Sequence, residues 1–214
     1  MIINIKNQDF TLHHLGAIYW NEKKTLLISD VHFGKVAHFR KHGIAIPRDV
    51  YIENYNNLDI LIATYNPDII VFLGDLFHSF LNSEWQIFKE WTKYIKRKVI
   101  LIEGNHDVID KEYYINLNIE VLPQLIWDDF LFTHHPIEHK KYFNFCGHIH
   151  PGVKLFGIGR QHLKLACFFQ TPNQMILPAF GSFTGKYFIA PTKDNTIFGI
   201  ADDTVFKIKF NEQI

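Results

Sequence analysis

The sequence is poor in cysteine: of its 214 residues, only Cys146 and Cys167 carry a thiol. Two cysteines are too few for a disulfide framework or for a thiolate zinc site. No apolar run reaches the roughly 18 residues of a membrane-spanning helix, so no such helix is expected. The first ten residues also lack a basic start followed by an apolar core, so no signal peptide is expected. We therefore predict a cytoplasmic protein without a membrane partner.

An excess of charge of either sign is also lacking. The 22 basic residues equal the 22 acidic residues, and the formal net charge at pH 7 is zero. This balance argues against a protein that coats nucleic acid through bulk charge, although a local basic patch can still bind it. Hydrophobic residues make up 47% of the chain and charged residues 21%, which excludes disorder. The length suits a single domain over residues 1–214.

Short apolar runs alternate with helical patterns over the first part of the chain. Five runs predict buried strands, at residues 26–28, 69–73, 99–102, 130–132 and 143–146. Pro47 opens a predicted helix that ends before Asn66-Pro67. The apolar stripe of this helix consists of Tyr51, Tyr55, Leu58, Leu61 and Tyr65. Alternation of strand, helix and strand favours parallel pairing.

A second helix is predicted to begin at Ser83, with Gln86 completing a capping box. Its stripe of Trp85, Phe88 and Trp91 is interpreted as core. Residues 2–5 and 17–20 are strand-like as well. After residue 150, short runs at 163–169, 175–177, 186–190, 196–200 and 205–210 predict antiparallel strands and hairpins. The fold class is therefore predicted as α/β, with two packed sheets flanked by helices.

Polar side chains follow each of the five early strands. The five segments are Asp30-Val31-His32, Gly74-Asp75, Gly104-Asn105-His106-Asp107, His134-His135-Pro136 and Gly147-His148-Ile149-His150. In an α/β sheet, ligands bind outside the carboxyl ends of the strands. The spacing of two in Asp-x-His and His-x-His would place both side chains on one side of an extended chain. We therefore expect these groups to converge.

The converging groups are donors for metal ions. They offer oxygen and nitrogen without sulfur, which favours Mn, Fe, Zn, Co or Ni, and we expect Mn²⁺ first. Seven donors are too many for one ion and suit two divalent ions roughly 3.5–4 Å apart that share a carboxylate and a water or hydroxide. Such a pair activates the water and holds a phosphoryl group during in-line attack. The pattern predicts phosphate ester hydrolysis.

In order and spacing, these motifs resemble the signature of the calcineurin-like metallophosphoesterases. The resemblance implies a two-sheet α/β–β sandwich in which one metal binds Asp30, His32 and His150. It also implies that the other metal binds Asn105, His134 and His148, with Asp75 as the bridge. His106 would contact the phosphate and protonate the leaving oxygen, and Asp107 would orient His106. His134 is chosen over His135 because it stands at the end of the strand.

Two further segments, residues 29–47 and 177–185, resemble the ligase-associated DNA damage response phosphoesterases of the PdeM type. That resemblance implies a nuclease or phosphodiesterase associated with DNA repair, with a DNA ligase and a helicase as partners. The segment Lys35–Arg48 carries four fixed positive charges and no acid. Lys35, Arg40 and Lys41 are candidates for contact with a phosphate backbone, and a solvated helix face explains the same pattern equally well.

The sequence thus predicts a metal-dependent phosphoric ester hydrolase acting on a phosphodiester, with DNA as the candidate substrate. One alternative is a phosphodiesterase for a small cyclic nucleotide or dinucleotide. Another is a metal-stabilised docking partner of a DNA ligase or helicase. His106 argues against a pure scaffold, because a scaffold has no need of a general acid.

Overall fold

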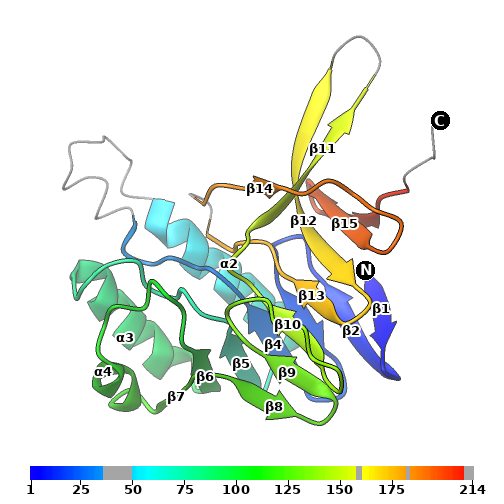
Figure 1. The fold of residues 1–214 in the computed structure, drawn as a ribbon. Coiled ribbons are helices and arrows are strands. Elements are labelled where there is room, and N and C mark those ends of the chain that lie inside the picture. The colour runs from blue at the N-terminus through cyan, green and yellow to red at the C-terminus, as the bar shows by residue number, and fades with distance from the viewer. Residues whose placement is uncertain (36–49, 158–160, 182–183, 210–214) are drawn as a thin grey trace.

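The computed structural model describes residues 1–35, 50–157, 161–181 and 184–209, which form two sheets and a helical layer (Figure 1). The first sheet has the order β1-β2-β3-β4-β5-β6-β7. Its strands are β1 (Ile2–Ile5), β2 (Gln8–Leu12), β3 (Ile18–Trp20), β4 (Thr25–Ile28), β5 (Ile69–Phe72), β6 (Lys98–Ile102) and β7 (Ile119–Leu122). Strands β1 to β4 pair antiparallel, and β4 to β7 pair parallel. The parallel part brings the carboxyl ends of β4, β5 and β6 to one edge.

The second sheet has the order β14-β11-β12-β13-β10-β9-β8, and β15 and β16 extend it from β12. Its strands are β8 (Leu125–Trp127), β9 (Phe130–Phe132), β10 (Phe143–Cys146), β11 (Pro151–Phe156), β12 (His162–Thr171), β13 (Gln174–Ile176), β14 (Tyr187–Phe188), β15 (Thr196–Ala201) and β16 (Thr204–Lys207). Strand β10 runs parallel to both β9 and β13, whereas β11, β13 and β15 are antiparallel to β12. The pairing of β9 with β10 aligns the ends that carry His134 and His148.

Side chains along the central strands point alternately to the two faces of the first sheet, and this alternation explains why the helices pack on one face and the second sheet on the other. Leu26 and Ile28 of β4 belong to the core shared with the helices α2 (Val50–Tyr65), α3 (Ser83–Ile95) and α4 (Lys111–Ile115). Leu27, between them, points to the other face and packs with residues of the second sheet, including Phe132 and Phe145. Successive side chains of a strand point to opposite faces, so a strand buried on both faces is apolar throughout. The predicted α/β–β sandwich is confirmed.

Most predicted elements are confirmed, and several details differ. The five early strands and the five late strands are present, but β14 pairs parallel with β11 and not antiparallel as predicted. The helices described here pack on the first sheet only, and a third apolar cluster that includes Cys146 and Cys167 forms on the other side of the second sheet. The N-cap of α3 is Asn82 and not Ser83, because the Asn82 side chain accepts the hydrogen bond from Glu84 N at 2.8 Å. The predicted capping box of Ser83 and Gln86 is therefore wrong.

The interpretation of the aromatic stripe on α3 as core is confirmed. Trp85, Phe88 and Trp91 are all buried, and Phe88 packs against Trp91 with ring centroids 5.9 Å apart. Both cysteines are free and buried, as packing residues are. Within the described ranges, no helix combines the length and the apolar character needed to cross a membrane.

Candidate metal centre

The loops that follow β4, β5, β6, β9 and β10 meet at one end of the sandwich. Three of these strands belong to the first sheet and two to the second, so the site lies where the two sheets meet. Hydrogen bonds join the loops directly: Asp30 N donates to Gly74 O at 3.2 Å, and His32 N donates to Asp75 O at 3.0 Å. Gly147 N donates to His134 O at 3.0 Å. These main-chain contacts fix the spacing of the side chains that the loops carry.

One group of side chains consists of Asp30, His32 and His150. Asp30 Oδ1 lies 3.1 Å from His150 Nε2, and the Nε2 atoms of His32 and His150 lie 3.5 Å apart. Asp30 Oδ2 accepts hydrogen bonds from Ser29 Oγ at 2.5 Å and from His148 N at 3.0 Å. Burial alone would raise the pKa of Asp30, but the contacts with His150 and Ser29 outweigh it and lower that pKa. Asp30 is therefore ionised at neutral pH, with Oδ1 facing the group.

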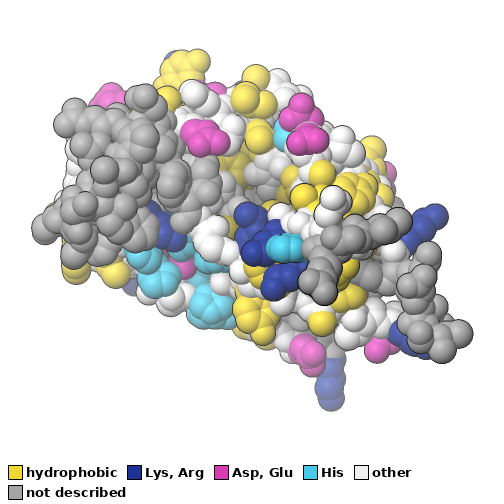
Figure 2. All heavy atoms as spheres, turned by 90° about the horizontal axis from the view of Figure 1, so that it is seen from above, with side chains coloured by type: hydrophobic (Ala, Val, Ile, Leu, Met, Phe, Trp, Pro, Cys, Tyr) yellow, Lys and Arg dark blue, Asp and Glu magenta, His cyan; other side chains and the backbone are white. Residues whose placement is uncertain are grey.

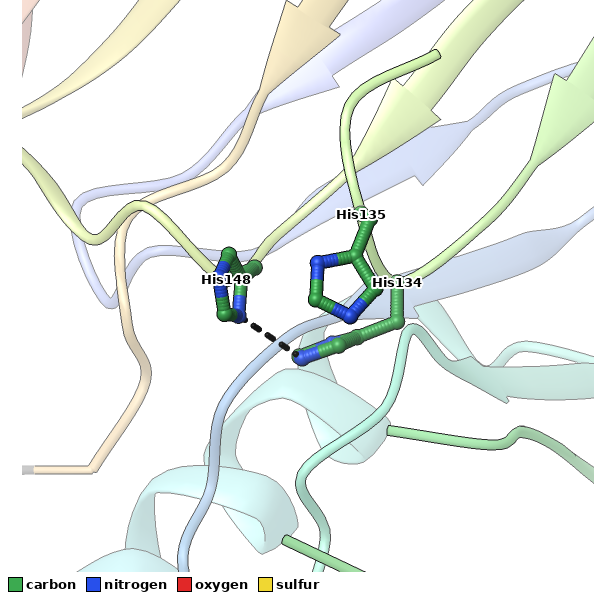
Figure 3. A group of neighbouring side chains, drawn as sticks. All are labelled: His134, His135 and His148. Atoms are coloured by element: carbon green, nitrogen blue, oxygen red, sulfur yellow. Dashed lines mark hydrogen bonds between the residues drawn. The ribbon is translucent and has the colours of Figure 1, made fainter. Parts of the chain in front are cut away.

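A second group surrounds His134. Its Nδ1 lies 2.9 Å from Leu73 O, which holds the proton on that nitrogen. Its Nε2 is then left with a lone pair, directed at Asn105 Oδ1 at 3.0 Å and at His148 Nδ1 at 3.2 Å (Figure 3). His134 Nε2 and Asn105 Oδ1 both carry lone pairs, so their approach is unfavourable unless a cation lies between them.

Asp75 connects the two groups. Its Oδ1 lies 3.4 Å from His134 Nε2. Donor atoms of Asp30, Asp75 and His134 all lie within 4.8 Å of one another. The same Oδ1 accepts a hydrogen bond from His106 N at 2.9 Å, which fixes the carboxylate. The seven donors expected from the sequence are thus brought together in the two expected sets, with Asp75 between them; metal binding by these residues stays a prediction.

The main chain at these donors is left-handed. The φ angles are 56° at Asp30, 53° at His32, 52° at Asp75, 68° at His148 and 52° at His150. Positive φ is uncommon for residues other than glycine and is concentrated at functional sites. The sequence argument assumed an extended chain in Asp-x-His and His-x-His, and this assumption is wrong, because both ends of each motif have positive φ.

Two glycines leave room for this arrangement. Gly74 has φ +85°, and a Cβ there would overlap the ring of His134. A Cβ at Gly147 would overlap Ser29 and the carboxylate of Asp30. Any larger residue at either position would push a donor out of its group.

Known proteins share this fold and these motifs. Residues 23–171 match the calcineurin-like phosphoesterase family. The chain belongs to this family. The crystal structure of the Pseudomonas putida nuclease MPE is similar at a TM-score of 0.82 and 29% identity, over 97% of this chain and 99% of that one. A probable glycerophosphodiester phosphodiesterase GpdQ of Arcobacter nitrofigilis is 36% identical over 64 residues, 25% of this chain. This chain matches only 23% of that relative's length.

As a member of the calcineurin-like phosphoesterase family, the protein is a hydrolase. His106 is the predicted proton donor of the reaction, and Asp107 is its predicted neighbour. His106 is exposed at the rim, with its ring centroid 6.0 Å from that of His32. The Asp107 carboxylate accepts main-chain hydrogen bonds from Asp75, Leu76, Phe77 and Gly104, at 2.9 to 3.0 Å. Among the described residues it makes no hydrogen bond to the His106 ring. Its contacts therefore support the Asp75 loop and not the predicted orientation of His106.

Of the candidates Lys35, Arg40 and Lys41, the described residues of this phosphoesterase include only Lys35. Lys35 is half-buried, and burial lowers its pKa, while Asp75 and Asp30 act in the opposite direction. Its ammonium group is thus within the field of both carboxylates. Arg40 and Lys41 lie outside the described residues. His135 is exposed, and its ring centroid lies 4.1 Å from that of His148, so it adds a nitrogen at the edge of the second group (Figure 3).

Burial favours the neutral form of two of the histidines in the donor groups, His32 and His148. Burial lowers the pKa of His32 to about 3, and Lys35, His150 and His78 contribute to the decrease. Burial also lowers the pKa of His148, helped by His135 and His134. Neutral imidazoles offer lone pairs, which a metal ion requires.

One residue near the reacting end was missed by the sequence analysis. His78 lies with its ring centroid 4.5 Å from that of His106 and 5.4 Å from that of His32. His78 is three residues after Asp75, in the loop that follows β5. This short separation from a predicted metal donor was the one signal in the sequence that could have indicated a further side chain at the rim. His78 does not directly follow a buried strand, so the pattern of polar residues at strand ends did not indicate it.

Proposed function

We propose that the protein is a dinuclear metal-dependent phosphodiesterase that cleaves nucleic acid. The observation that carries the proposal is the pair of donor groups that meet at Asp75, each with imidazole nitrogens aimed at carboxylate or amide oxygens. The donor set fits divalent ions of the Mn, Fe, Zn, Co and Ni type, because it contains hard oxygen and borderline nitrogen and no sulfur. Mn²⁺ is the first choice.

The residues that would hold the ions form two sets, according to which side chains contact one another. Asp30, His32 and His150 would hold one, and Asn105, His134 and His148 the other, with Asp75 shared. When bound, such a pair activates a water and neutralises charge on the phosphoryl oxygens. Two buried hydrogen bonds, donated by His134 Nδ1 to Leu73 O and by Ser29 Oγ to Asp30 Oδ2, keep the metal donors oriented before any ion arrives.

The other side chains at the rim have complementary roles. His106 is exposed and lies beside the donors, so it is able to give a proton to the leaving oxygen. Lys35 supplies a positive charge on the side of Asp30 and Asp75, where a phosphate oxygen would approach. Asp107 holds the main chain of the Asp75 loop in place. Each role is performed by a group whose position the main chain fixes.

A diester of nucleic acid is the substrate class that agrees best with the relatives. One relative similar over nearly the whole chain is named a nuclease, and another is named a probable phosphodiesterase. A role in DNA repair beside a ligase or a helicase rests on the resemblance of residues 29–47.

The substrate class is tested with purified protein loaded with Mn²⁺. We would compare a chromogenic phosphodiester, a phosphomonoester, cyclic nucleotides, single-stranded DNA and nicked DNA. Cleavage of the chromogenic diester and of DNA, with little activity on cyclic nucleotides, is expected. Activity confined to cyclic nucleotides would replace the proposal with a small-substrate phosphodiesterase.

The number of ions is tested by elemental analysis of variants under saturating Mn²⁺. Asp75→Asn should lower occupancy at both positions because it weakens the shared oxygen, whereas His32→Ala should remove close to one ion per chain. His162→Ala, at an exposed position of β12, is the matched control and should retain both ions. Full activity with one ion per chain in the unmodified protein would contradict a dinuclear centre.

A further inference from the structure

A basic surface begins where the metal centre ends. Strand β11 starts directly after His150, forms a hairpin with β12 that extends beyond the rest of the sheet, and has β14 along its other edge (Figure 1). Residues 139–193, which contain all three strands, include seven Lys or Arg and no Asp or Glu. In a chain of zero net charge, this segment has a clear excess of positive charge.

The register of the strands gathers that charge on one face. Lys154 of β11 is directly opposite Lys164 of β12. Phe188 of β14 pairs with Gly152, which lies two residues before Lys154 and therefore on the same face. The Nζ atoms of Lys154 and Lys164 lie 4.8 Å and 5.8 Å from the centre of the Phe188 ring. Both lysines and the neighbouring Lys186 are exposed.

We call Lys154, Phe156, Lys164, Lys186 and Phe188 the basic platform. Like charges directly opposite each other destabilise a pair of strands. Among the described residues, no carboxylate forms an ion pair with any of the three lysines; the Phe188 ring alone offers a weak cation–π contact to two of them. An arrangement that costs stability and leaves three ammonium groups facing solvent is suited to bind an anion with several charges.

The basic platform is continuous with the metal centre. Tyr187 N donates a hydrogen bond to His150 O at 2.9 Å, so β14 is attached to the loop that carries a metal donor. A cavity of about 210 Å³ has His150 and Lys186 in its lining, together with Ala166, Gly181 and Thr184. Figure 2 shows Lys and Arg side chains gathered on this face, with histidines beside them. A chain of phosphates held on the platform would pass beside the metal donors.

The platform also presents aromatic surface. Phe156 at the end of β11 is 82% exposed. It lies two residues after Lys154 and therefore on the same face as that lysine. Exposed rings beside cationic side chains stack unpaired bases while the cations contact the backbone. In a duplex the bases are already stacked on one another and cannot stack on exposed protein rings. The combination of lysines and exposed rings therefore favours binding of a single strand.

We propose that the basic platform binds a single-stranded segment of the nucleic-acid substrate and leads it into the metal centre. Lys154, Lys164 and Lys186 contact phosphates, and Phe156 stacks on a base. This inference rests on the proposed function, because the bound strand is the substrate that the metal centre cleaves.

The first test removes the charge. The triple variant Lys154→Gln, Lys164→Gln, Lys186→Gln is compared with Lys93→Gln, Lys96→Gln, Lys98→Gln, which removes three exposed lysines near the amino end of β6, away from the metal centre. The KM for a single-stranded DNA oligonucleotide should rise in the platform variant only. The slope of log affinity against log salt should decrease by at most about 2, since each lost contact contributes about 0.7. Hydrolysis of a small chromogenic diester should be equal in all three proteins.

The second test separates stacking from charge. Phe156→Ala should raise the KM for the single strand by about fivefold or more, and Phe156→Tyr should retain it. Cleavage of duplex DNA should change little in either variant. An equal effect of Phe156→Ala on single and double strands would overturn base stacking on the platform.

The outcomes distinguish this inference from the proposed function. If the platform variant keeps the oligonucleotide KM and salt slope of the control, the platform proposal is overturned while the nuclease proposal stands. If the unmodified protein cleaves neither DNA nor the chromogenic diester, the proposed function fails first. Polyglutamate serves as the probe for an acidic protein partner: its binding to the platform, combined with unchanged DNA kinetics, would overturn the nucleic-acid assignment in favour of that partner.

Discussion

The rings of His78 and His106 lie 4.5 Å apart, centroid to centroid, at an interplanar angle of 49°. His78 comes from the loop after β5 and His106 from the loop after β6, and both rings also contact His32. An exposed imidazole that must meet a leaving oxygen benefits from a neighbour that restricts its position. The pair therefore combines an accessible proton donor with a ring that limits where it can move.

Replacement of His106 should damage turnover and leave the metal donors intact. In His106→Asn we expect kcat to decrease by roughly 10²–10⁴-fold on a poor leaving group, because a general acid is lost. The loss should be much smaller with nitrophenolate, which needs little protonation. Steady-state kinetics on both substrates, with metal content measured beside them, checks this. An equal loss on the two leaving groups would instead make His106 a phosphate-binding residue.

The contact between the two rings predicts a specific coupling. His78→Ala should lower kcat less than His106→Ala does, and the double variant should be no slower than His106→Ala alone, because His78 acts through the other ring. His78→Phe keeps a flat ring and should recover part of the loss. Losses that multiply in the double variant would show that His78 contacts the substrate independently.

The sequence predicted the donors because parallel strands deliver their carboxyl ends to one edge. Asp30, Asp75 and Asn105 each follow a run of residues that are apolar on both faces, and such runs are buried strands. The helix stripe around Phe88 was predictable for the same kind of reason, since residues three and four apart share a face. In both cases the structure follows from a pattern within a short stretch of sequence.

Features that depend on pairing between distant segments could not be predicted. Nothing in the motif at His148 says that β10 belongs to a different sheet from β6, and the left-handed φ of His150 is imposed by contacts with another loop. Lys154 and Lys164 become neighbours only through the register of β11 and β12. The N-cap of α3 could not be predicted for a different reason. Asn82 and Ser83 are adjacent and both are residues that cap helices well, so the sequence does not distinguish them.

Asp107 should prove to be a stabilising residue of the site. Its two oxygens accept four main-chain N–H groups, two each. Asp107→Asn keeps one acceptor oxygen and turns an amide toward two donors, and each donor left unsatisfied costs about 1–3 kcal/mol. Thermal unfolding should therefore show a clear decrease in Tm, together with weaker metal binding through the displaced Asp75 loop.

Asp110→Asn is the matched control for that experiment. Asp110 caps α4 by accepting from Glu112 N at 3.0 Å, and asparagine caps a helix equally well. Its Tm should stay close to that of the unmodified protein. A Tm for Asp107→Asn that equals the control would mean that the loop keeps its shape without the carboxylate.

The last prediction concerns acid and a histidine that belongs to neither donor group. Burial lowers the pKa of His13 to about 4, with His14 and the amino terminus contributing, although Asp203 acts in the opposite direction. In the unfolded chain a histidine has a pKa near 6.5. Between these two values the unfolded chain takes up a proton that the folded protein does not. The contribution of neutral His13 to stability is therefore complete above pH 6.5 and is lost as the pH falls toward 4.

His13→Asn should remove this dependence while it keeps the local hydrogen bond. His13 Nδ1 accepts from Leu15 N at 3.2 Å, and an asparagine side-chain oxygen is able to accept the same hydrogen. We expect the Tm of metal-free His13→Asn to fall less steeply than that of the unmodified protein between pH 6.5 and pH 4. His162→Asn, at an exposed position, should follow the unmodified protein because its environment is solvated in both states. Parallel curves for all three proteins would mean that His13 is protonated in the folded state and that its burial does not exclude the charge.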